Sequence, residues 1–209
     1  MLTQPPTFDG ERELNAQGYR LIAGIDEVGR GTIAGPVFAA AVILPLEADI
    51  PWLLLVRDSK QLSPRRREYL FELIQQTSVA MGIGVVPHTE IDGRGIVRAT
   101  QLAMSRAIDQ LPCTPDFLLI DALALPEVSL PQRSIVHGDQ RSLSIACASI
   151  VAKVSRDRYM VELDSLYPHY GLARHKGYAT REHLLCLRQL GPCPIHRQSF
   201  APVRRLLGR

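Results

Sequence analysis

The sequence predicts an α/β protein with a mixed five-stranded sheet flanked by helices and a small helical C-terminal extension. Three observations lead to this prediction. Three strand-like segments come first, and the short connection between the first two favours antiparallel neighbours. Two further strand-like segments follow, separated from the first three by helical patterns. The remainder of the chain is helical in pattern and punctuated by glycine and proline. Together these segments indicate a layered α/β fold.

The elements can be placed from periodicity and from turn residues. The first strand is the apolar run Leu21–Asp26, and Gly35-Pro36 opens the second, Val37–Leu44. Ser63 is expected to cap a helix that has Pro64 at its first position. The remaining expected strands are 78–86, 115–121 and 133–136, and the expected helices are 64–76, 96–111, 143–166 and 180–190.

A chain of 209 residues has the length of one domain and buries roughly 70% of its unfolded surface, so it needs no disulfide to fold. The polar segment 1–19 contains Pro5-Pro6 and is expected to be a flexible N-terminal arm. Residues 20–209 are expected to form one domain, including a helical part from about residue 167. No repeat or low-complexity segment divides it.

The cysteines and the hydropathy pattern point to a reducing cytoplasm. No cysteine pair has the spacing of a metal site or a redox motif, and Cys147 lies among small apolar residues, as expected of a packed thiol. The N-terminus lacks the features of a signal peptide. The longest apolar run, Val37–Leu44, is too short to cross a membrane. We therefore expect a cytoplasmic protein that does not contact membranes.

The net charge of +3 conceals an asymmetry. Residues 1–130 carry 11 Lys and Arg against 16 Asp and Glu, whereas residues 131–209 carry 13 against 5. A basic C-terminal portion beside acidic side chains suggests a polyanionic partner such as nucleic acid. Taken alone, the same arginines could simply keep helices solvated.

Carboxylates follow three of the predicted strands. Asp26 and Glu27 end the first strand, Asp121 ends the fourth, and Asp139 comes shortly after the fifth. Alone, the Asp26-Glu27 pair could cap a helix or form an ion pair with Arg30. In open α/β sheets, however, chemistry is found at the carboxyl ends of the strands. We therefore expect these four side chains to converge.

Converging carboxylates require cations, because two such charges about 4 Å apart repel by roughly 4 kcal/mol at an effective dielectric constant of 20. Oxygen ligands without His or Cys favour Mg²⁺ or Mn²⁺. A pair of such ions is a common device for phosphodiester hydrolysis. Since neighbouring strand residues point to opposite faces, we expect Asp26 to bind by its carboxylate. Glu27 is expected to act where the strand breaks, through its backbone carbonyl.

Several motifs resemble one family. Gly24-Ile25-Asp26-Glu27-Val28-Gly29-Arg30-Gly31 is similar to the opening signature of ribonuclease HII, the type 2 ribonuclease H. The other similar motifs, in order over about residues 20–203, are 58–60 (Asp-Ser-Lys), 119–121 (Leu-Ile-Asp), 138–139 (Gly-Asp), 144–157, 175–178 (His-Lys-Gly-Tyr) and 194–200. The resemblance implies a ribonuclease H-like fold for the domain. It also implies endonucleolytic cleavage 5′ of a ribonucleotide, in RNA–DNA hybrids or embedded in duplex DNA, which leaves 3′-hydroxyl and 5′-phosphate ends and serves ribonucleotide removal.

The resemblance also assigns residues. Asp26, Glu27, Asp121 and Asp139 match the acidic quartet that is catalytic and binds the metal. The residues expected to bind the substrate are Gly29, Arg30, Gly31, Lys60 and Tyr178, with the glycine-flanked backbone and the tyrosine reading the ribose. Lys153 and Arg156 are expected to support the site or to contact phosphate.

The sequence departs from the family pattern at two points, and two other functions remain open. His137 stands where lysine is common, and Ala122 and Leu123 follow Asp121 where glycine is usual. The alternatives are a type 3 ribonuclease H-like hybrid nuclease and a non-catalytic nucleic-acid-binding module. Only about twenty residues precede the first strand, which argues against the type 3 arrangement. Lacking an apolar heptad pattern, the chain is expected to be a monomer.

Overall fold

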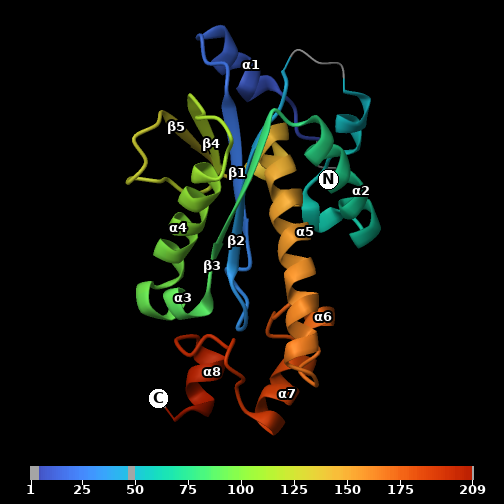
Figure 1. Cartoon of the computed structure of the whole chain (residues 1–209), viewed down its shortest axis with the longest axis vertical. Helices are drawn as coiled ribbons and strands as arrows, with labels where there is room; N and C mark the ends of the chain where they lie inside the picture. The colour runs from blue at the N-terminus through green and yellow to red at the C-terminus, as the bar shows by residue number, and fades with distance from the viewer. Residues whose placement is uncertain (1–4, 47–49, 209) are drawn as a thin grey trace.

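A mixed five-stranded sheet is the centre of the computed structural model, which describes residues 5–46 and 50–208. The strand order is β3-β2-β1-β4-β5 (Figure 1). The strands are β1 (Ile22–Val28), β2 (Val37–Ile43), β3 (Ala80–Val86), β4 (Phe117–Asp121) and β5 (Gln132–Ile135). The first three are antiparallel, whereas β4 runs parallel to both β1 and β5. The predicted fold class is confirmed.

The pairing of β1 with β4 brings two acidic residues to one edge of the sheet. The last paired residues of these parallel strands are Ile25 and Ile120. Asp26 and Asp121 come next on their respective strands. Because parallel strands end at the same edge, both aspartates lie where the strand ends meet.

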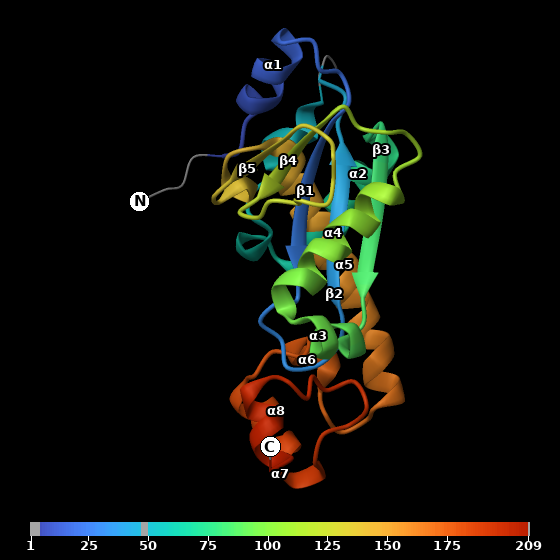
Figure 2. The ribbon, with the colours of Figure 1, turned by 90° about the vertical axis from the view of Figure 1, so that its left-hand side faces the viewer.

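Helices cover both faces of the sheet. The long helix α5 (Leu143–Leu166) packs on one face, with α2 (Pro64–Thr77) beside it, and α4 (Ile96–Asp109) packs on the other (Figures 1 and 2). Gly24 allows α5 to approach β1 closely, because a Cβ at this position would lie 2.1 Å from the backbone carbon of Ser144. This contact brings α5 against the strand that carries Asp26.

Local signals set the starts of the principal helices. Ser63 accepts a hydrogen bond from the N–H of Arg66 and Pro64 follows it, as predicted. Ser142 caps α5 and Thr180 caps α7 (Arg181–Leu190) in the same way. The shorter helices are α3 (His88–Arg94), α6 (Leu172–His175) and α8 (Ala201–Leu206).

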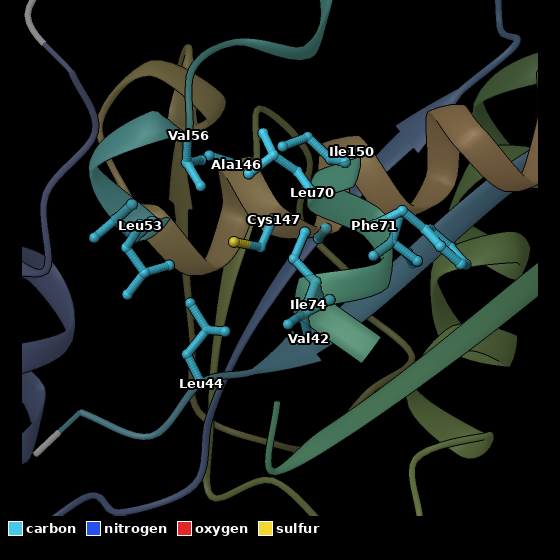
Figure 3. Packing of buried hydrophobic residues seen from close by; sticks show 14 of the residues in the cluster. Val42, Leu44, Leu53, Val56, Leu70, Phe71, Ile74, Ala146, Cys147 and Ile150 are labelled. Carbon is cyan, nitrogen blue, oxygen red and sulfur yellow. The ribbon is translucent and has the colours of Figure 1, made fainter. Parts of the chain in front are cut away.

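One of the two main parts of the core lies between β2, α2 and α5 (Figure 3). Figure 3 shows Leu70 and Ile74 of α2 facing Cys147 and Ile150 of α5, with Val42 of β2 beneath them. Cys147 is fully buried and its thiol is free, as expected of a packed cysteine. A second apolar cluster fills the space between α4 and the opposite face of the sheet.

The N-terminal segment differs from the flexible arm expected for residues 1–19. Residues 1–4 lie outside the described part of the chain. Helix α1 (Asp9–Ala16) follows them and is anchored by two fully buried side chains, Glu11 and Leu14. Glu11 accepts hydrogen bonds from the hydroxyls of Ser142 and Ser144, both 2.6 Å from its Oε1, at the start of α5. A carboxylate at a helix N-terminus is favourable, so this segment is held to the domain.

The C-terminal helices lie at the end of the molecule toward which β1 points, opposite α1 (Figures 1 and 2). They are joined to the segment after β1 by a bridge between Ala34 and His196. Among the described residues, no helix has both the length and the apolar character needed to cross a membrane.

Candidate active site

Asp26 and Asp139 are buried carboxylates at the strand ends. Asp26 is 5% exposed and Asp139 is 3% exposed. Asp139 lies in a short 3-10 turn, Gly138–Gln140, which follows β5. Asp121 accepts a 2.7 Å hydrogen bond from the N–H of Gly138, so the fourth strand holds the turn that carries Asp139.

Glu27 does not occupy the position expected from the sequence. Strand β1 continues to Val28 and Glu27 pairs with Ala39, so the expected break in the strand at Glu27 is wrong. Its neighbour Asp26 pairs with Ala40, which places the two carboxylates on opposite faces, as expected. Oε1 of Glu27 lies 3.2 Å from Nη1 of Arg30. Oε2 is buried and has no hydrogen-bond partner among the described residues.

The pKa shifts show that these carboxylates lie in one another's electric field. Burial raises the pKa of Asp26 well above its usual value, and the charges of Glu27 and Asp121 raise it further. Burial also raises the pKa of Glu27, against the opposing effect of Arg30. The pKa of Asp139 is raised by burial and by Asp58.

Lys60 faces all of this negative charge. Its Nζ lies 3.6 Å from Oδ2 of Asp139, although the side chain is 80% exposed. Burial alone would lower the pKa of Lys60. The charges of four aspartates nevertheless raise it above its usual value: Asp139, Asp58, Asp26 and Asp121. Carboxylates from β1, β4 and two loops therefore all act electrostatically on Lys60.

These residues fit a divalent cation. Within the described residues, no three His, Cys, Asp or Glu side chains are gathered closely enough to hold one metal ion. Without a metal ion, repulsion between the carboxylates favours keeping them apart. A bound cation would instead favour bringing them together. Asp26, Asp121 and Asp139 offer hard carboxylate oxygens, and Glu27, whose carboxylate lies on the opposite face of β1 from that of Asp26, would contribute its backbone carbonyl oxygen. Asp26, Glu27, Asp121 and Asp139 are the residues that would hold the ion.

The two glycines that flank Arg30 differ in their surroundings. Gly29 has φ of +92°, and a Cβ there would lie 2.3 Å from Nε of Arg156. Gly31 is exposed, and apart from its chain neighbours no atom of the described residues lies within 4 Å of the position its Cβ would take. Gly29 is therefore required by the protein's own packing, whereas Gly31 leaves open space in which a ligand can approach the backbone.

Tyr178 lies beside this segment, with 40% of its surface exposed. The carbonyl of the preceding residue, Gly177, accepts a 2.9 Å hydrogen bond from the N–H of Ile33. A Cβ on Gly177 would lie 2.5 Å from the carbonyl oxygen of Ala34. The structure thus brings Tyr178 next to the segment that contains Gly29, Arg30 and Gly31.

Buried histidines support the Tyr178 segment. Nδ1 of His183 lies 2.9 Å from the carbonyl oxygen of Tyr178, so it carries the proton and donates. Nε2 of His183 must then accept from Nε2 of His196, 3.0 Å away, and Nδ1 of His196 accepts from the N–H of Cys193. Each ring nitrogen of His183 and His196 has a hydrogen-bond partner when both rings are neutral. Burial accordingly lowers the pKa of each histidine to about 4.

Some site residues were not assigned from the sequence. Asp58 accepts from the N–H of Lys60 at 2.9 Å, and the hydroxyl of Ser149, which lies 2.9 Å from that of Ser59, acts to lower the pKa of Asp26. Asp58 and Ser149 both lie within motifs that resemble the family, but the spacing of the residues did not indicate their roles. Lys153 was expected near the site, yet its Nζ is bound to Asp157 at 2.7 Å, one helical turn along α5.

Comparison with known proteins identifies what this arrangement is similar to. The family model described as Ribonuclease HII matches residues 23–203. A Ribonuclease HII from Dehalococcoides mccartyi is 53% identical over 201 residues, covering 96% of this chain and 95% of the relative. The crystal structure of ribonuclease H2 from Pyrococcus horikoshii OT3 has a TM-score of 0.76 and 26% identity, covering 91% of this chain and 98% of that one. Bst-RNase HIII, crystallised in complex with Mn²⁺, shares the fold at 20% identity and a TM-score of 0.70, covering 90% of this chain and 69% of that one.

Proposed function

The chain belongs to the ribonuclease HII family and is therefore a hydrolytic nuclease, and we propose that it cleaves the phosphodiester on the 5′ side of a ribonucleotide. The proposed substrates are RNA–DNA hybrids and duplex DNA with embedded ribonucleotides, and the products carry 3′-hydroxyl and 5′-phosphate ends. The observation that carries this proposal is the placement of Asp26 and Asp121 just beyond the last paired residues of β1 and β4, with Asp139 in the turn that Asp121 holds and Lys60 3.6 Å from Asp139. Removal of ribonucleotides from DNA in the cytoplasm follows as the proposed role.

The proposed division of labour uses this chain's own groups. Asp26, Glu27, Asp121 and Asp139 would hold Mg²⁺ or Mn²⁺, which supplies Lewis acidity and lowers the pKa of a bound water. Lys60, exposed and oriented by Asp139, is placed to bind a phosphate oxygen. Arg30 is tied to Glu27 and half-exposed, so it can reach the same polyanionic backbone. Mn²⁺ in the related Bst-RNase HIII structure supports the choice of metal.

Recognition of the ribose is proposed for the backbone of Gly29, Arg30 and Gly31 together with Tyr178. The 2′-hydroxyl distinguishes RNA from DNA. A site built to hydrogen-bond that hydroxyl can reject the deoxy analogue by about 10⁴–10⁵-fold. The open space at Gly31 and the exposed Tyr178 beside it support this assignment. The monomer remains the proposed oligomeric state.

The test replaces Asp121 by Asn, which keeps the side-chain shape and an acceptor for the Gly138 N–H but removes the charge. We expect loss of cleavage with retained binding to a duplex that contains one ribonucleotide. Asp109→Asn, at an exposed position at the end of α4, serves as the control and should cleave normally. Unchanged cleavage by Asp121→Asn would overturn the assignment. Loss of binding together with cleavage would argue that Asp121 holds the fold rather than the metal.

A further inference from the structure

Two fully buried arginines lie behind the segment that contains the proposed ribose-reading backbone. Arg156 is on α5 and Arg197 precedes α8, and both are 0% exposed. Within the described residues, neither forms an ion pair with a carboxylate. Burial lowers the pKa of Arg156 to about 10 and that of Arg197 to about 9, so both remain protonated at neutral pH. Burying such charges is costly unless other groups compensate.

Backbone carbonyls provide the compensation, and they belong to one segment, residues 29–36, here called the recognition loop. Arg197 donates to the carbonyl oxygens of Gly29 at 2.7 Å, Arg30 at 3.0 Å and Gly35 at 3.0 Å. Arg156 donates to the carbonyl oxygens of Ala34 and Pro36 and to the hydroxyl of Thr32. These distances are 3.3, 3.0 and 3.0 Å.

These bonds orient the other side of the same peptide groups. In a trans peptide the C=O and the following N–H point in opposite directions. Holding the carbonyls of Gly29 and Arg30 against Arg197 therefore turns the N–H groups of Arg30 and Gly31 away from it. Neither N–H has an acceptor within the described part of the chain. They are two unused donors beside the open space at Gly31.

Arg156 also binds the second proposed recognition element. Its Nη1 donates to the carbonyl oxygen of Lys176 at 2.9 Å, two residues before Tyr178. One side chain therefore links the recognition loop to the Tyr178 segment.

We propose that Arg156 and Arg197 are positioning residues that set the preference for ribose over deoxyribose without touching the substrate. They hold the two outward N–H donors and Tyr178 at a fixed spacing. The planar fork of arginine can bond several carbonyls at once, whereas the ammonium of lysine carries the same charge at a single point. The proposal rests on the function proposed above, because it assumes that this surface reads the ribose.

The test measures dissociation constants in the Asp121→Asn background, which removes cleavage. Two duplexes are compared, one with a single ribonucleotide and one all DNA. We expect Arg197→Lys and Arg156→Lys to reduce the ratio of the two constants on the order of 10–100-fold. Affinity for the all-DNA duplex should change little. Arg106→Lys is the matched control, because Arg106 binds the carbonyl of Val85 and Glu90 away from the loop.

Three outcomes separate a failure of the proposed ribose reading from a failure of the proposed role of the arginines. A parent protein that binds both duplexes equally would show that the proposed ribose reading itself is wrong. If the Asp121→Asn protein prefers the ribonucleotide-containing duplex and the folded lysine variants keep the same preference, the proposed role of the arginines is overturned. If the lysine variants do not fold, Thr32→Val decides. It removes a hydroxyl that accepts from Arg156 and donates to the Gly29 carbonyl, yet keeps both arginines. A reduced ratio in Thr32→Val supports the proposal, and an unchanged ratio contradicts it.

Discussion

Nζ of Lys60 lies 3.6 Å from Oδ2 of Asp139, joining an exposed cation to a carboxylate that is almost completely buried. The pair brings the positive charge of an exposed side chain to the edge of the acidic site. Lys60 is thereby placed between the carboxylates and any phosphate that approaches from solvent.

We expect Lys60→Met to weaken binding of a ribonucleotide-containing duplex by about 10–100-fold, the cost of one charge-assisted hydrogen bond. The slope of log affinity against log salt concentration should fall by about 1. Lys60→Arg keeps the charge and should retain the wild-type slope. The measurement is fluorescence anisotropy over a salt series, and equal slopes for wild type and Lys60→Met would rule out a phosphate contact.

Asp26→Asn should stabilise the metal-free protein at pH 8 while abolishing cleavage. Burial, Glu27 and Asp121 raise the pKa of Asp26 in the folded state above its unfolded value. Its ionisation therefore opposes folding, and this penalty grows as the pH rises from the unfolded pKa through the folded one. The stability advantage of Asn should accordingly be small in acid and largest at high pH. Thermal unfolding in chelator at several pH values measures it, and a less stable variant at pH 8 would contradict the account.

Gly29→Ala should lower the stability of the protein, whereas Gly31→Ala should lower its affinity for the substrate. A methyl group at Gly29 would collide with Arg156 at a positive φ, so we expect a clear loss of thermal stability. A methyl group at Gly31 would meet no atom of the described residues beyond its chain neighbours, so that variant should unfold like wild type but bind the ribonucleotide-containing duplex more weakly. Equal affinity of Gly31→Ala and wild type would show that the ligand does not approach here.

The hydrogen-bonded histidines His183 and His196 should make the protein less stable as the pH falls. Burial lowers the pKa of His183 and His196 to about 4, below the unfolded value of 6.5. Their contribution to stability should be fully present above about pH 6.5 and lost as the pH falls through about 4. We expect His183→Gln to be destabilised at pH 7, with a difference from wild type that shrinks toward pH 4. Denaturant unfolding across this range tests it, and a constant difference would refute the neutral arrangement.

Most of the fold could be predicted because hydrophobic periodicity reports burial directly. The expected strand 115–121 contains β4, and the expected helix 143–166 coincides with α5. Helix α1 could not be predicted, because its anchor is the bond between Glu11 and two serines more than 130 residues away. Its polar composition carries no sign of that distant partner.

The site could be predicted only in part, because local patterns can be read from the sequence whereas contacts between distant residues cannot. Strand-end acids can be read from the sequence, but the carbonyl partners of Arg156 and Arg197 depend on loop geometry that no pattern encodes. The departure at Ala122 has a structural meaning. Ala122 has φ of +53°, a conformation that costs a non-glycine residue about 1–2 kcal/mol and that glycine adopts without this cost.

Metal-dependent incision beside a ribonucleotide is the activity proposed for this site. The most direct measurement uses three otherwise identical labelled duplexes: all DNA, DNA with one ribonucleotide, and DNA paired with RNA. Each is incubated with the protein in Mg²⁺, in Mn²⁺ and in chelator, and the cleavage position is read on a sequencing gel. We predict incision on the 5′ side of the lone ribonucleotide in either metal, none in chelator, and an intact all-DNA duplex. Cleavage of the all-DNA duplex, or undiminished incision in chelator, would contradict the account.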